Sequence, residues 1–180
     1  MRHVIALAIL FVATTATAAP SEISVSPSAT QDAVTEGETT LSAEPDIAYA
    51  VVADYAQWSV MFPDINQVIV TSRTAGDARV TLVHRDGNRD NLHFRNQPAA
   101  RMVWFEDTGG RAEVWAELVF LPGDRPGTTR LHSRLYADVH GVASLLVSDR
   151  KLRNLREQRV RDDLTRLRAF FAREGSIAGR

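Results

Sequence analysis

The sequence predicts one α+β domain, in which a curved antiparallel sheet of about six to seven strands packs against one long C-terminal helix. Two segments, 112–120 and 130–139, alternate apolar and polar residues, which is typical of strands with one buried face. Residues 143–173 carry an apolar stripe at helical spacing. Between a first strand and the sheet, residues 45–62 predict two short helices.

Residues 1–19 have the pattern of a secretory signal peptide. A basic start is followed by an apolar run from Val4 to Ala13 and by a small-x-small cleavage signal that ends at Ala18. The run is too short to span a bilayer as a helix. We therefore expect cleavage near Ala18 or Ala19 and a periplasmic or secreted protein; the alternative is an uncleaved anchor.

The composition is that of a globular domain. The chain has 180 residues, of which 44% are hydrophobic and 24% are charged, and its formal net charge is −1. That charge argues against a nucleic-acid partner. The chain contains no cysteine, which excludes thiol catalysis, cysteine-ligated zinc and iron–sulfur clusters. We expect no cofactor, no metal and no transmembrane segment in the mature chain.

The folded domain is expected to cover residues 32–174. Residues 20–31 are rich in Ser, Pro and Ala and are expected to be a flexible lead-in, and residues 175–180 a C-terminal tail. Residues 32–41 alternate weakly and predict an edge strand.

A helix is predicted from Pro45, a residue that suits the first turn. Its expected buried face consists of Ile47, Val51, Val52 and Tyr55. A short aromatic helical turn follows, and a proline at position 63 ends it because proline disfavours helical geometry at the residue before it.

A series of strands separated by turn residues comes next. The expected strands are Val68–Ser72, Arg79–Arg85, Arg89–Arg95, Arg101–Asp107 and the two alternating segments. In the last hairpin we expect Val114 and Leu118 on the buried face. Glu113 and Glu117 are expected on the wet face near Arg130 and Arg134.

The apolar stripe of the long helix contains Leu145, Leu152, Leu155, Leu164, Leu167, Phe170 and Phe171. Residues 150–173 also include nine basic and three acidic side chains. Interspersed acids favour a solvated outer face, and peripheral contact with an anionic membrane is the alternative.

One stretch resembles the START-like (SRPBCC) superfamily of polyketide cyclases, dehydrases and lipid-transfer proteins, which is also called Bet v 1-like. It contains Val51-Val52, Asp54, Tyr55, Trp58, Phe62-Pro63 and Val68–Val70, and residues 128–139 resemble the family's last strand. The resemblance covers roughly residues 35–173. It implies a helix-grip fold, in which the sheet wraps around the long helix and leaves an apolar cavity. The signal peptide departs from the cytoplasmic location that is common in this superfamily.

The resemblance leads us to expect a ligand cavity whose lining is apolar. The candidate lining residues are Trp58, Phe62, Trp104, Val114, Leu118, Leu131, Leu135, Leu152 and Leu155. The alternative is that these side chains form an ordinary core.

For each titratable residue that could bind a metal or act in acid–base catalysis, a structural or surface role is the alternative. His84 and His93 flank the Asp86-Gly87 turn. If residue 85 lies opposite residue 88, the two histidine side chains would share one sheet face. Together with Asp90 they would then be candidate ligands of a metal site. We favour solvated surface histidines, and read His132 and His140 in the same way. Asp54 is the candidate acid–base residue, although a capping or inter-element hydrogen bond is the preferred interpretation.

The leading functional hypothesis is an exported soluble protein that binds an apolar small molecule, such as a lipid, a quinone or a polyketide-like compound. A cyclase- or dehydratase-type enzyme that uses the same cavity is one alternative. A docking module for a protein or a membrane, with its cavity filled by its own side chains, is another. No sequence motif assigns catalytic residues.

Overall fold

The computed structural model describes residues 23–110, 112–139 and 148–178, with the backbone alone for residues 139 and 174–178. The expected signal peptide therefore lies outside the described residues. The elements follow the chain in this order: β1 (Ser24–Pro27), β2 (Val34–Leu41), α1 (Pro45–Ala53), η1 (Tyr55–Gln57), α2 (Trp58–Met61), β3 (Ile65–Arg73), β4 (Asp77–His84), β5 (Arg89–Gln97), η2 (Pro98–Ala100), β6 (Met102–Asp107), β7 (Ala112–Pro122), β8 (Thr129–Val139) and α3 (Asp149–Ala178).

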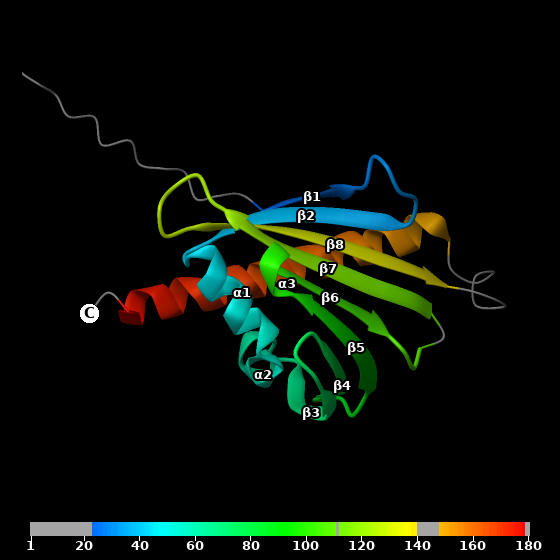
Figure 1. Ribbon diagram of the computed structural model, residues 1–180. Helices are drawn as coiled ribbons and strands as arrows, with labels where there is room; N and C mark the ends of the chain where they lie inside the picture. Colours follow the sequence, from blue (N-terminus) through cyan, green and yellow to red (C-terminus); the bar gives the residue numbers. More distant parts are fainter. Residues whose placement is uncertain (1–22, 111, 140–147, 179–180) are drawn as a thin grey trace, which may run out of the picture.

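The strands form one antiparallel sheet of eight strands in the order β1-β2-β8-β7-β6-β5-β4-β3, and α3 lies across one face of it (Figure 1). The predicted α+β helix-grip architecture is confirmed. The sheet has more strands than expected because β1 forms inside the segment that we expected to be a flexible lead-in, and it pairs with β2. As a result β2 is an inner strand rather than an edge strand.

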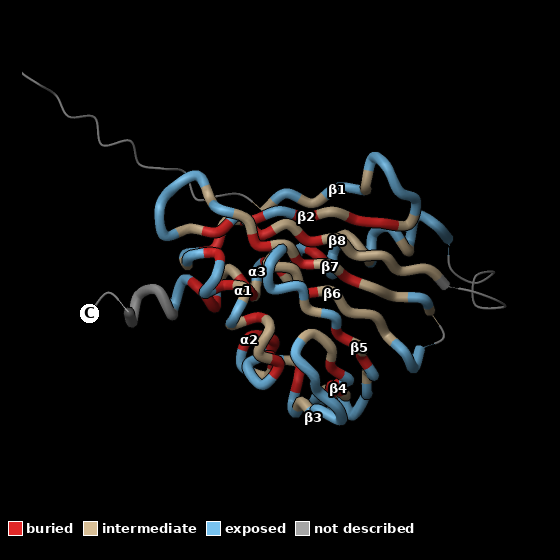
Figure 2. The backbone as a smooth tube through the Cα atoms, in the orientation of Figure 1, coloured by how far each residue is buried: buried red, intermediate tan, exposed pale blue. Residues whose placement is uncertain are grey.

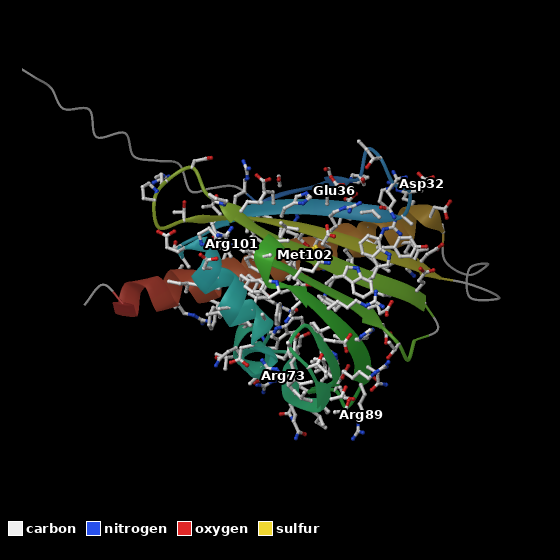
Figure 3. All side chains as sticks on the ribbon, viewed as in Figure 1. Asp32, Glu36, Arg73, Arg89, Arg101 and Met102 are labelled. Atoms are coloured by element: carbon white, nitrogen blue, oxygen red, sulfur yellow. The ribbon has the colours of Figure 1, made fainter. Side chains whose placement is uncertain are left out.

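Helix α1 begins at Pro45, as predicted, but its buried face differs from the expected one. Pro45, Ala48 and Val52 are buried, whereas Ile47 is 57% exposed. The helix rests on the sheet through its smaller side chains. Outside the core, the guanidinium of Arg101, which precedes β6, donates to Asp46 in the first turn of α1 and joins the two elements (Figure 3).

Alternation along β7 gives the predicted inner and outer faces. Ala116, Leu118 and Phe120 are buried, and Val114 is half-buried on the same side. On the outer face Glu117 lies opposite Arg134, with 3.6 Å between Oε1 and Nη1. The expected proximity of Glu113 to Arg130 is wrong, since the register places Glu113 opposite Asp138.

Among the described side chains of helix α3, those that pack tightly start at Val160. Its buried side chains there are Val160, Leu164, Leu167, Phe170 and Phe171, each at most 6% exposed, whereas Leu155 is 53% exposed. The helix continues to Ala178, into the expected tail. The first helical turns that the sequence predicts, at residues 143–147 and including Leu145, lie outside the described residues. Buried segments gather where α1, α2 and the middle of the sheet meet (Figure 2).

None of the described helices combines the length and the apolar character that crossing a bilayer would require.

Candidate functional site

A cavity of about 380 Å³ lies between the inner face of the sheet and α3. Small side chains on the central strands create this space: Ala116 on β7, and Ser133 and Ala137 on β8. They point inward because alternate residues of a strand share one face. The volume lies within the range of about 300–1,000 Å³ that is usual for ligand pockets.

Aromatic rings close one end of the cavity. Trp58 and Phe62 line it from the α2 region and Phe105 from β6. The indole of Trp58 lies edge-on to the ring of Phe94, with 5.1 Å between centroids, and its Nε1 donates to the carbonyl of Val52 at 2.9 Å. This packing fixes the Trp58 ring, which gives the cavity a rigid end wall.

Helix α3 forms the wall that faces the sheet. Its apolar lining residues run from Leu152 through Val160 to Leu167. Leu155 lines the cavity although more than half of it is exposed, so the cavity is open to solvent beside the first half of α3.

The structure brings together seven of the nine residues that the sequence singled out as lining. These are Trp58, Phe62, Val114, Leu118, Leu135, Leu152 and Leu155. Their role in binding stays a prediction. Trp104 lies on the outer face of β6, where the guanidinium of Arg95 sits 4.6 Å from its ring centroid. Leu131 is fully buried in the packed core, away from the cavity.

A charged cluster, which sequence reasoning missed, borders the cavity. Arg159 donates through Nε to Asp163 at 2.8 Å, one turn along α3. Arg166 donates through Nη1 to Asp64, just before β3, also at 2.8 Å. Because 102 residues separate Arg166 from Asp64, no local sequence signal could have paired them.

Burial shifts the ionisation of the pair on α3. It raises the pKa of the Asp163 carboxyl, although the guanidinium of Arg159 pulls that pKa down. Burial also tends to lower the pKa of Arg159, but the negative charge of Asp163 more than offsets this, so the pKa of Arg159 is raised. The pair therefore presents a charged guanidinium beside the cavity.

The expectation of solvated histidines is wrong for His84 and His93, whose side chains are only 14% and 12% exposed. His84 Nε2 lies 2.8 Å from Asp90 Oδ2, and its Nδ1 lies 3.8 Å from Asp64 Oδ2. On the other face, His93 contacts Asp77 at 2.6 Å and a glutamate of β6 at 3.1 Å.

The two histidines are on opposite faces because of the register between β4 and β5. Val83 lies opposite Arg89, one position away from the expected pairing. A shift of one residue moves a side chain to the other face of a sheet. Among the residues that the structure describes, no group of three or more His, Asp or Glu side chains is arranged to hold a metal ion.

The remaining titratable candidates lie away from the cavity lining. Asp54 is the residue at which α1 ends, and its backbone N–H donates to Ala50 and Val51. His132 pairs with Val119 across the hairpin and is half-buried on the outer face. His140 lies outside the described residues.

Solved structures with the same architecture include several proteins of the superfamily that the sequence resembles. The Zhui aromatase/cyclase from a Streptomyces species shares 16% identity, with 88% of this chain and 97% of that chain covered and a TM-score of 0.64. A START superfamily protein from Mycobacterium smegmatis shares 14% identity, with 78% and 97% covered and a TM-score of 0.64.

The di-domain ARO/CYC protein BexL shares 18% identity over 76% of this chain, with a TM-score of 0.66, and this chain spans 45% of its length. No family model matches the sequence, and comparison with curated proteins gives no match. The aligned architecture, together with the α3 grip and the cavity beneath it, identifies the fold of this chain as the START-like helix-grip fold.

Proposed function

We propose that this protein is exported and binds an apolar small molecule, such as a lipid, a quinone or a polyketide-like compound, between the sheet and α3. The observation that carries the proposal is a cavity of about 380 Å³ whose walls are mainly aromatic and aliphatic side chains. Transfer of an apolar ligand into such a space contributes roughly 25 cal/mol for each Å² removed from water.

Export is the part of the proposal that rests on sequence alone. Residues 1–19 supply the signal, and the absence of cysteine is compatible with an oxidising compartment because a core of this size needs no disulfides. The start of α3 presents exposed Arg150, Lys151 and Arg153 next to the opening of the cavity. These side chains support a transient contact with an anionic membrane during ligand exchange.

An enzyme that uses the same cavity is the second candidate, and the charged cluster at the wall is the observation that favours it. The cyclases among the solved structures make this reaction class relevant. However, both ring nitrogens of His84 face carboxylates, and a histidine paired in this way is poorly placed to accept a proton from a ligand. Asp163 is paired through one oxygen only: Oδ2 accepts from Arg159, whereas Oδ1 is buried without a hydrogen-bond partner. A docking module with a collapsed cavity is less well supported, since the cavity is open.

Binding of the neutral fluorescent probe N-phenyl-1-naphthylamine tests the proposal. We expect saturable binding with enhanced probe fluorescence. Ala116→Phe places a ring in the cavity and should abolish binding, whereas Val119→Phe, on the outer face of the same strand, should not. Leu152→Trp, at the more open wall, is a second blocking variant in case the first does not fold.

Two results would contradict the proposal: a wild-type protein that does not bind the probe, or folded blocking variants that bind it as well as wild type does. Native mass spectrometry of protein purified from its own periplasm should reveal a co-purifying apolar mass. Conversion of such a compound by the protein would support the enzyme instead.

A further inference from the structure

Most charged residues that line the cavity already have partners. Asp90 contacts the ring of His84 at 2.8 Å, Asp163 accepts from Arg159 at the same distance, and Asp107 accepts from the backbone N–H of Gly109 at 2.9 Å. These contacts neutralise or orient the side chains within the protein. One acceptor, Oδ1 of Asp163, is buried without a hydrogen-bond partner, and it could bind a donor of a ligand but not an anion.

Arg156 differs from these residues. Its Nη1 donates to the carbonyl of Ala137 at 2.8 Å, and its Nε is buried without a hydrogen-bond partner. Within the described part of the chain, no carboxylate forms an ion pair with it. A guanidinium has five N–H donors. A partly buried cation with unused donors is costly unless an anion completes its surroundings.

The position of Arg156 on α3 makes it more unusual. Leu152, Arg156 and Val160 follow one another at intervals of four residues, so they share one helix face, and all three line the cavity. A charged residue thus occupies a position in the apolar stripe, where an apolar side chain would be expected if only packing mattered. It lies one residue after Leu155, beside the opening.

We infer that the ligand of this cavity is an anionic amphiphile whose carboxylate binds Arg156 while its apolar body lies between the sheet and α3. The inference rests on the proposed binding function and deepens it. A carboxylate matches the planar donor geometry of a guanidinium and can accept two parallel hydrogen bonds. The apolar body then extends toward Trp58 and Phe62 at the closed end.

Displacement of N-phenyl-1-naphthylamine from the purified protein by dodecanoate and by dodecanol, at pH 8, tests the inference. The two competitors have the same chain length and differ in the charged group. We expect dodecanoate to bind wild type on the order of tenfold more tightly or better, as for a charge-assisted hydrogen bond. Arg156→Gln should lose this preference and keep its affinity for probe and dodecanol. Arg161→Gln, an exposed change on the same helix that does not line the cavity, should behave as wild type.

Equal affinity of wild type for the two competitors would overturn the inference while the proposed function stands, because probe and alcohol still bind. A preference for dodecanoate that survives Arg156→Gln would also overturn it. If wild type binds neither the probe nor either competitor, the proposed function fails, and the inference with it. If Arg156→Gln does not fold, Arg156→Lys keeps the charge without the planar donor pair and should reduce the preference.

Discussion

At the scale of single residues, Gly37 controls how closely α3 approaches the sheet. It lies on the inner face of β2, opposite Ser133 of β8. A Cβ atom at this position would clash with Cγ1 of Val160 and would lie 2.8 Å from Cδ1 of Leu164. Both partners are buried, at most 2% exposed. The missing side chain of Gly37 therefore lets α3 pack directly against the strand.

Gly37→Val should push α3 away from β2 and reduce the free energy of unfolding by about 1–3 kcal/mol, the usual cost of overpacking. Glu38→Ala, at the next and exposed position, should cost less than about 1 kcal/mol. Chemical denaturation of both variants measures the difference. Equal stability of wild type and Gly37→Val would mean that the helix and strand are not in this close contact.

At the scale of elements, α3 serves two purposes along its length. From Val160 to Phe171 its inner side chains are buried, although Val160, Leu164 and Leu167 also line the cavity; from Leu152 to Arg159 it covers the cavity with side chains that are half-buried or exposed. The packed half holds the helix against β2, while the other half leaves room for a ligand. The turns from Val160 onward therefore contribute to both stability and the cavity wall, whereas the turns before it contribute mainly to the wall.

Truncation before Arg161 should abolish folding. It removes four buried apolar side chains, Leu164, Leu167, Phe170 and Phe171, each worth about 1.5–3 kcal/mol on burial. Total stability of a domain is about 5–15 kcal/mol. Leu155→Ala, an exposed change, should unfold at nearly the same denaturant concentration as wild type. A cooperative unfolding transition in the truncated protein, followed by circular dichroism, would contradict this assignment.

At the scale of the whole molecule, the proposed export signal and the cavity lie in separate parts of the chain. The expected signal lies in residues 1–19, and the described fold begins at Ile23 with β1 soon after. Because β1 pairs with β2, cleavage close to the folded domain leaves an ordered strand near the new N-terminus. A mature chain that starts near Ala19 or Pro20 would keep the whole sheet.

N-terminal sequencing of the exported protein should therefore begin near Ala19 or Pro20. Ala18→Phe should block cleavage, because the signal needs a small residue there. Thr17→Phe changes the tolerant middle position and should be processed normally. An exported protein that still begins at Met1 would exclude cleavage and support an anchor instead.

Much of the fold was predictable because its signals are local. Alternation in β7 and β8, the proline at the start of α1 and the stripe of α3 each depend on neighbours a few residues away. Misjudged positions depend on packing between elements: Ile47 has helical spacing, yet the smaller Ala48 faces the sheet. Strand β1 was missed because a Ser- and Pro-containing segment becomes a strand only by pairing with β2.

The sequence by itself determined the fold class and most of the apolar wall, since both follow from the periods of strands and helices. Tertiary structure decided the rest of the site. The β4–β5 register sends His84 and His93 to opposite faces, and chain segments 102 residues apart bring Arg166 to Asp64. The tertiary structure also shows that Arg156 lines the cavity. The sequence places many arginines on this helix, and only the packing of α3 against β8 shows that this one points inward.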